Sequence, residues 1–250
     1  MPLSPDFDAY LRELAAWGDF NDGLRSANRF VIKDRSFIER VLQAARRCEI
    51  EIEPLSVFYR ARRLPFDRAR MRDPFPLSEM GAPPAKLASP GRLNPEGIPC
   101  LYVADHEQTA IAEIRPYRGA VVCVSRLRNP QPLRVVDLLR GRALGPDDAT
   151  VRCLSRMLAQ PVHHDDALGY VGTQFLAETL KAEGFAGIRY ESALRDGGWN
   201  IALFDTAAAT VADVRVFTVH DVSHNASEQA SATKALEAMF VQGVLRARGT

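Results

Sequence analysis

An arginine, a tyrosine and a glutamate, Arg92, Tyr102 and Glu113, follow one another at separations of 10 and 11 residues. A guanidinium can bind two phosphate oxygens at once, and a phenol ring offers a flat face for stacking. A carboxylate can hold ribose hydroxyls or stabilise a positive charge that develops during a reaction. These three kinds of side chain together predict a site for a ligand that carries both phosphate and sugar.

The local sequence predicts the elements that must present these side chains. Four glycines and prolines in the segment 91–99 indicate a loop around the arginine. The apolar run 98–104 has the length of a strand and contains the tyrosine, and the helical pattern at 106–115 contains the glutamate. A loop, a strand and a helix that follow directly in the chain would thus present the three side chains.

Three further polar residues are candidates for the same site. Arg60 ends the strand-like run 53–60, where an inward-facing arginine is costly unless it meets an anion. Asn94, two residues after Arg92, can orient the loop through its side-chain amide. Ser192 has no G-x-S-x-G context, so we expect it to form hydrogen bonds with the ligand and not to act as a nucleophile.

The order of these motifs resembles the RES-domain family, which is named for an arginine, a glutamate and a serine. In that family a G-R-x-N loop precedes a tyrosine and then a helix that carries the glutamate, and its serine ends one strand before an asparagine opens the next. The similarity covers about residues 54–210 and includes the segment 170–178, which resembles the helix before the serine. The residues that match are Arg60, Arg92, Asn94, Tyr102, Glu113, Tyr170 and Ser192.

This resemblance implies a fold, an activity and roles for the matched residues. The fold would be a mixed α/β (α+β) domain similar to ADP-ribosyltransferases, and the protein would be the cytoplasmic toxin of a bacterial toxin–antitoxin pair. NAD+ would be its substrate and not a retained cofactor. The implied catalytic residues are Glu113, Arg92 and Ser192, and the implied substrate-binding residues are Arg60, Tyr102, Asn94 and Tyr170.

The reaction implied by the resemblance is attack on the bond between nicotinamide and ribose, which would deplete cellular NAD+ and arrest growth. The acceptor stays open. Water would make the protein a hydrolase, inorganic phosphate a phosphorylase, and a protein side chain an ADP-ribosyltransferase. The alternative from another functional class is a non-catalytic protein that binds a partner on a RES scaffold.

Composition narrows the partners further. The chain has 250 residues with 32 basic and 31 acidic side chains, so its formal charge of +1 gives no reason to expect nucleic acid as a partner. No run approaches 18 apolar residues, and no basic segment followed by an apolar stretch opens the chain, so we expect neither a membrane span nor a cleaved secretion signal. A cognate antitoxin and a second copy of the chain are the protein partners considered, and no residue identifies either.

We expect no metal and no disulfide. The run His163-His-Asp-Asp166 is the one arrangement that suggests metal, but adjacent ligands point in different directions and no histidine pair at helical i, i+4 spacing accompanies them. The four cysteines are widely spaced and form no C-x-x-C pair, which favours reduced, mostly buried thiols. The absence of G-x-G-x-x-G after a strand also counts against a Rossmann dehydrogenase.

The pattern along the chain predicts three parts. Residues 1–52 form a helical appendage that packs on the core or binds a partner, residues 53–226 form the RES domain, and residues 227–250 form a C-terminal helix. Inside the domain, helical patterns lie near 106–115, 148–160 and 172–183, and 64–90 reads as a long loop. The strand-like runs are 53–60, 98–104, 120–127, 133–138, 186–190, 200–204 and 211–219.

Overall fold

The structure is a computed structural model that describes residues 5–139, 148–159, 166 and 168–223. The chain up to His220 forms one compact unit, and all elements below belong to it. The helix expected at 227–250 lies outside the described residues, and so do His163 and Asp165.

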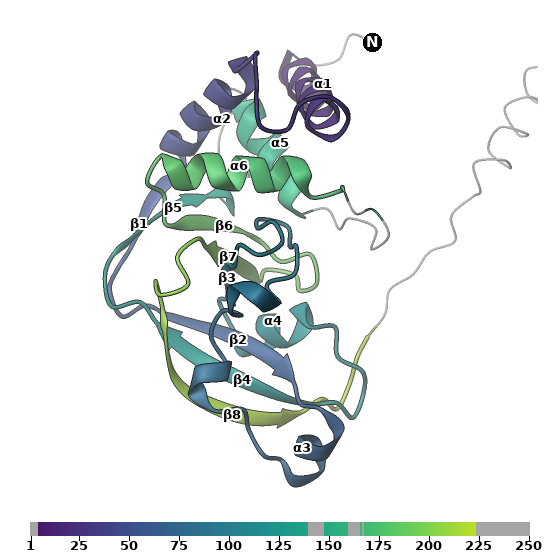
Figure 1. Cartoon of the computed structure of the whole chain (residues 1–250), viewed down its shortest axis with the longest axis vertical. Coiled ribbons are helices and arrows are strands. Elements are labelled where there is room, and N and C mark those ends of the chain that lie inside the picture. The colour runs from purple at the N-terminus through teal and green to yellow at the C-terminus, as the bar shows by residue number, and fades with distance from the viewer. Residues whose placement is uncertain (1–4, 140–147, 160–165, 167, 224–250) are drawn as a thin grey trace, which may run out of the picture. The chain divides into compact units, whose positions relative to one another are not determined.

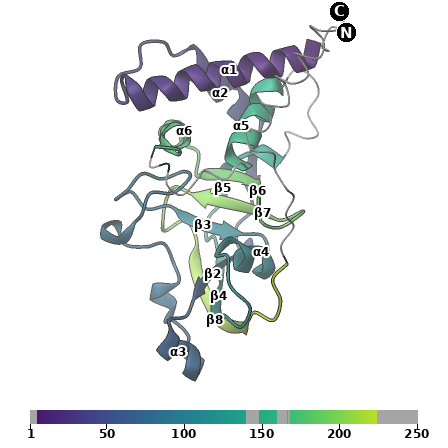
Figure 2. The same cartoon turned by 90° about the vertical axis from the view of Figure 1, so that its right-hand side faces the viewer.

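One mixed sheet of eight strands organises the unit (Figures 1 and 2). The strands are β1 (Glu49–Ile52), β2 (Val57–Arg63), β3 (Leu101–Ala104), β4 (Val121–Arg128), β5 (Leu133–Asp137), β6 (Gly187–Glu191), β7 (Trp199–Leu203) and β8 (Thr210–Thr218). Their order across the sheet is β1-β5-β6-β7-β3-β2-β4-β8. Strands β5 and β6 pair in parallel, and the other neighbours are antiparallel.

Helices cover the half of the sheet that contains β5 and β6 (Figure 1). Helices α5 (Ala149–Ala159) and α6 (Val171–Ala182) contact β6, and α2 (Ser36–Arg47) contacts β5. Helix α1 (Pro5–Ser26) packs on α5 and α6. The predicted helices at 148–160 and 172–183 are therefore confirmed to within a few residues.

Shorter helices lie around the other half of the sheet. Helix α4 (Glu107–Glu113) packs against β2, β3 and β4. The segment 64–90, expected to be a loop, contains the short helix α3 (Phe66–Met71) and two 3-10 turns, η1 (Leu77–Glu79) and η2 (Ala85–Leu87).

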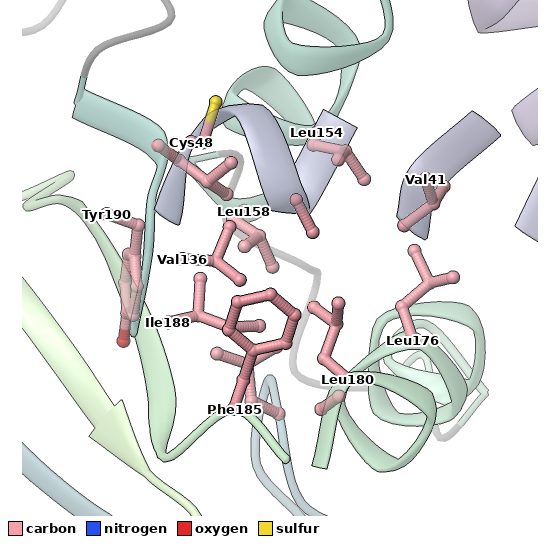
Figure 3. Packing of buried hydrophobic residues seen from close by; sticks show 14 of the residues in the cluster. Val41, Cys48, Val136, Leu154, Leu158, Leu176, Leu180, Phe185, Ile188 and Tyr190 are labelled. Atoms are coloured by element: carbon pink, nitrogen blue, oxygen red, sulfur yellow. The ribbon is translucent and has the colours of Figure 1, made fainter. Parts of the chain in front are cut away.

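Both faces of the sheet are buried around strands β3, β5 and β7, which explains the near-continuous apolar runs of these strands. On the helix-covered face, side chains of α2, α5 and α6 meet Val136 and Ile188 of the sheet (Figure 3). On the opposite face, Leu101 and Val103 of β3 pack in a second cluster. Tyr102, between them in sequence, points to the first face and packs against the first cluster.

The expected division at residue 52 falls at the end of a strand. The segment Glu-Ile-Glu-Ile at the end of the expected appendage is strand β1, which pairs with β5. Its alternation of charged and apolar residues has the period of a strand, but four residues are too few to stand out beside two helices. Phe37 and Val41 of α2 are buried in the core shared with α5 and α6, so the amino-terminal helices pack on the core, which is one of the two expected alternatives.

The four cysteines, Cys48, Cys100, Cys123 and Cys153, are all buried, as predicted. No helix in the described part of the chain is long and apolar enough to cross a membrane. The expected mixed α/β fold is confirmed.

Candidate active site

A cleft of about 300 Å³ opens where β2, β3 and α4 meet. Strands β2 and β3 pair at only one position, Tyr59 with Ala104, and β2 continues along β4 while β3 continues along β7. The two halves of the sheet therefore separate beside this pair, which gives access to side chains between them. Four of the predicted site residues line the cleft, namely Arg60, Arg92, Tyr102 and Glu113.

Glu113, the last residue of α4, is held by two donors from other elements. Its Oε1 accepts hydrogen bonds from the Ser192 hydroxyl at 2.7 Å and from the Asn200 side-chain amide at 2.7 Å. The Ser192 oxygen in turn accepts from the backbone N–H groups of Leu194 and Arg195, each at 3.2 Å. The Ser192 oxygen accepts from these N–H groups while the Ser192 hydroxyl proton is donated to Glu113, so the serine positions the carboxylate.

Asn200 is a site residue that the sequence did not single out. It lies in β7, is 5% exposed and lines the cleft beside Glu113. The sequence showed it only as the residue that opens a strand after the serine. A polar side chain within an otherwise apolar strand is the signal that could have identified it, because a buried amide must find a hydrogen-bond partner.

The loop that carries Arg92 is fixed from inside by Tyr102 and Asn94. The Tyr102 hydroxyl accepts from the Leu93 backbone N–H at 2.9 Å and donates to Asn94 Oδ1 at 2.8 Å. The Asn94 amide donates to three carbonyls of the loop, those of Ser89, Pro95 and Ile98. Burial raises the pKa of Tyr102 well above its ordinary value, so its hydroxyl stays protonated and keeps both roles.

Gly91 is required by the close approach of these side chains. A Cβ at position 91 would collide with Asn94 Oδ1 and lie 2.9 Å from the Tyr102 hydroxyl. The glycine, arginine and asparagine of the G-R-x-N motif therefore form one unit with the tyrosine that follows. Two of its residues shape the loop, and the arginine points into the cleft.

Helix α6 holds the same loop from outside. The Thr173 hydroxyl donates to the Arg92 carbonyl at 2.6 Å. The Gln174 side-chain amide donates to the carbonyls of Gly91 at 2.9 Å and Asn94 at 3.0 Å. These contacts join residues 80 or more positions apart, and they explain why the segment 170–178 accompanies the arginine loop.

Helix α6 is itself packed closely against α1. At Gly172 a Cβ would collide with the Trp17 ring and with Asn21 Oδ1. Only a glycine lets the two helices approach to this distance. The amino-terminal helix is therefore in direct contact with the element that holds the Arg92 loop.

Two guanidinium groups in the cleft have N–H groups without a hydrogen-bond partner in the described part of the chain. Arg60 donates from Nη1 to the Tyr102 carbonyl at 2.8 Å, while its Nε is buried without a hydrogen-bond partner in the described part of the chain. Arg92 Nη1 is buried and unpartnered in the same sense, and its guanidinium lies 5.9 Å from the Tyr190 ring centroid. Burial lowers the pKa of Arg60 to about 10, which leaves it a cation at neutral pH.

Three predicted site residues, Asn94, Tyr170 and Ser192, are not among the residues that line the cleft, and Ser192 contacts it through its hydrogen bond to Glu113. Asn94 is 3% exposed and its amide is used within the loop, so it orients the segment that carries Arg92, as the sequence indicated, and its role in substrate binding stays a prediction. Tyr170 precedes α6 and is not among the residues that line the cleft. Its phenol is close enough to Tyr190 to influence the pKa of that residue. Burial is the main cause that raises the pKa of Tyr190; the Arg92 cation lowers this pKa, and Glu113 and Tyr170 raise it further.

The metal candidate lies mostly outside the described residues. Asp166 is described and pairs with Arg25 at 3.1 Å. Within the described ranges, no group of three or more histidine, cysteine or acidic side chains could hold a metal ion.

The comparison with known families decides which family this architecture represents. The RES domain family matches residues 57–225, which is more than half of the chain. This chain belongs to the RES domain family. The match begins at β2 and continues past β8, so it includes every residue of the cleft described above.

Solved structures and curated proteins were also compared with this RES domain protein. One similar structure is the M. tuberculosis MbcT–MbcA toxin–antitoxin complex, with 16% sequence identity and a TM-score of 0.43 over 72% of this chain and 93% of that chain. Among the curated proteins, none matches this chain.

Proposed function

We propose that this RES domain protein cleaves the bond between nicotinamide and ribose in NAD+ and acts as the toxin of a toxin–antitoxin pair. The observation that carries the proposal is the Glu113 carboxylate, held by Ser192 and Asn200 in a cleft that also contains two arginines with spare N–H groups.

The arginines supply binding of the diphosphate. A buried donor without a partner costs about 1–3 kcal/mol, and phosphate oxygens are acceptors of the kind that a guanidinium binds best. Arg60 and Arg92 both line the cleft, and each has a buried N–H that has no partner in the described part of the chain. Tyr102 and Tyr190 also line the cleft and offer apolar walls for a sugar or a flat ring.

Glu113 supplies the charge that the reaction requires. As the C1′–N bond breaks, nicotinamide leaves with the bonding electrons and positive charge develops on the ribose, as in other glycosyl transfers. A carboxylate already fixed by two hydrogen bonds needs no reorganisation to stabilise that charge. By analogy with the loss of one oxyanion donor, its contribution is about 3 kcal/mol or more.

The acceptor is the open part of the proposal. The Glu113 side chain is exposed, so a water molecule, a phosphate ion or a protein side chain could reach the reacting carbon. Each acceptor loses a proton to the carboxylate or to solvent and gives a different product. Membership of the family supports consumption of NAD+ and an antitoxin partner without selecting among the three.

The test is incubation of the purified protein with NAD+, with and without inorganic phosphate. Release of nicotinamide together with ADP-ribose would identify a hydrolase, and ADP-ribose 1″-phosphate would identify a phosphorylase. Transfer of ADP-ribose to an added bacterial lysate would identify a transferase. A folded protein that releases no nicotinamide under any of these conditions would refute the proposal and favour a non-catalytic partner-binding protein.

A further inference from the structure

Two aromatic side chains face each other beside the cleft, apart from the predicted site residues. Tyr59 of β2 lines the cleft, and His106, which precedes α4, is exposed. Their rings are nearly parallel, with an interplanar angle of 6° and centroids 6.3 Å apart.

The backbone fixes this pair in place. Tyr59 is the one residue of β2 that pairs with β3, and its partner Ala104 stands two residues before His106. The pair therefore lies where the two halves of the sheet are still joined, at one end of the cleft. Tyr59 is placed by the strand register, and His106 by the two-residue connection between β3 and α4.

The pair and the reacting carboxylate lie at opposite ends of α4. His106 precedes the helix and Glu113 ends it, and seven residues at 1.5 Å each span about 10 Å. Arg60 follows Tyr59 in β2, and its guanidinium reaches toward the Tyr102 carbonyl. Aromatic rings, a cation and a carboxylate are thus available at separate places along one cleft.

NAD+ has a matching arrangement, because a diphosphate separates its nicotinamide riboside from an adenine ring. We infer that Tyr59 and His106 form a subsite for the adenine ring, an inference that rests on the function proposed above. Bases stack on exposed aromatic side chains in many nucleotide-binding proteins, since every base has a flat π-face.

The spacing of the rings suits this role. A base held between two rings needs about 7 Å between them, twice the optimal carbon contact distance of about 3.5 Å. The exposed His106 side chain can supply the small additional separation by rotating, since exposed rotamers interconvert rapidly. The subsite would make a base-bearing dinucleotide a better ligand than a ribose phosphate alone.

The experiment compares two ligands that do not react. ADP-ribose contains the adenine ring, and ribose 5-phosphate lacks it. In Tyr59→Leu and in His106→Leu, calorimetric affinity for ADP-ribose should fall about 5- to 140-fold, which corresponds to about 1–3 kcal/mol of base stacking, while affinity for ribose 5-phosphate stays unchanged.

Matched variants separate stacking from other causes. Tyr59→Phe and His106→Phe keep a ring at each position and should bind ADP-ribose nearly as the wild type does. Tyr117→Leu removes an exposed tyrosine outside the cleft and should have no effect. Circular dichroism and thermal unfolding would show that the leucine variants remain folded.

The outcomes distinguish this inference from the proposed function. Leucine variants that bind ADP-ribose like the wild type, or that lose both ligands equally, overturn the adenine subsite. A wild type that releases nicotinamide from NAD+ but binds ADP-ribose no better than ribose 5-phosphate also overturns the subsite alone. A wild type that neither releases nicotinamide nor binds ADP-ribose overturns both.

Discussion

The contact between α6 and the Arg92 loop gives the sharpest test of how the site is positioned. Thr173→Val removes the hydroxyl that donates to the Arg92 carbonyl at 2.6 Å but keeps a similar shape. Gln174→Leu removes both donors to the carbonyls of Gly91 and Asn94. In each variant, carbonyls of a partly buried loop lose partners, and the loop that presents the guanidinium is free to shift.

The size of the effect can be bounded from these bonds. Leaving one buried acceptor unsatisfied costs about 1–3 kcal/mol. If the loop of the free variant relaxes to satisfy its carbonyls, ligand binding must restore the original loop and therefore costs that free energy. Each 1.4 kcal/mol corresponds to about a tenfold change in affinity. We therefore expect Thr173→Val to weaken ADP-ribose binding by up to about 100-fold and to raise KM for NAD+ more than it lowers kcat. Thr173→Ser keeps the donor and should behave nearly as the wild type.

The assay combines calorimetric binding of ADP-ribose with nicotinamide release and thermal unfolding. A purely structural role for Thr173 would lower the unfolding temperature and leave the affinity of the folded protein unchanged. Wild-type affinity and KM in folded Thr173→Val would refute the view that α6 positions Arg92.

Four further expectations concern the site and its support. Glu113→Ala should abolish nicotinamide release with an unchanged circular dichroism spectrum, because the carboxylate acts on charge that appears only as the bond breaks; wild-type turnover would remove Glu113 from the reaction. Arg92→Lys should bind ADP-ribose about tenfold or more weakly, since one ammonium cannot replace a bidentate guanidinium, and equal affinity would exclude a phosphate contact. ADP-ribose affinity should fall as the pH rises through about 10, where Arg60 with its lowered pKa loses its charge, and the Arg60→Leu variant should lack this fall. If both proteins share the same pH profile, the fall in affinity comes from a group other than Arg60. Deletion of residues 1–50 should prevent folding. Burial of the Phe37 and Val41 side chains alone stabilises the fold by about 1.5–3 kcal/mol each, against a total stability of about 5–15 kcal/mol. A soluble, protease-resistant fragment would contradict this expectation.

The sequence predicted the parts of the site that depend on local pattern. Arg92, Tyr102 and Glu113 occupy a loop, a strand and a helix that follow directly in the chain, so their periodicity and turn residues sufficed to place them. The resemblance added Arg60 and Ser192. Seven of the eight strands were also found locally, because a buried strand is apolar and bounded by turn residues, whereas β1 was missed.

What the sequence did not show is the set of long-range contacts. Asn200 reaches Glu113 across 87 positions, and Thr173 reaches the Arg92 carbonyl across 81. No periodicity in a single sequence reveals which distant carbonyl a threonine will meet. The sequence indicated that Asn94 orients the loop, but the three carbonyls that its amide meets become visible only when the loop is folded.

The boundary of the family match and the boundary of the fold are different, and this difference has a physical origin. The match begins at residue 57, whereas β1, α1 and α2 precede it and belong to the same compact unit. Gly172 shows why the earlier segment is needed: α6 lies so close to Trp17 that no Cβ fits between the helices. The next two residues of α6 hold the carbonyls of the Arg92 loop. Since α6 is supported on one side by α1 and supports the loop on the other, the position of the arginine depends on a helix outside the family match.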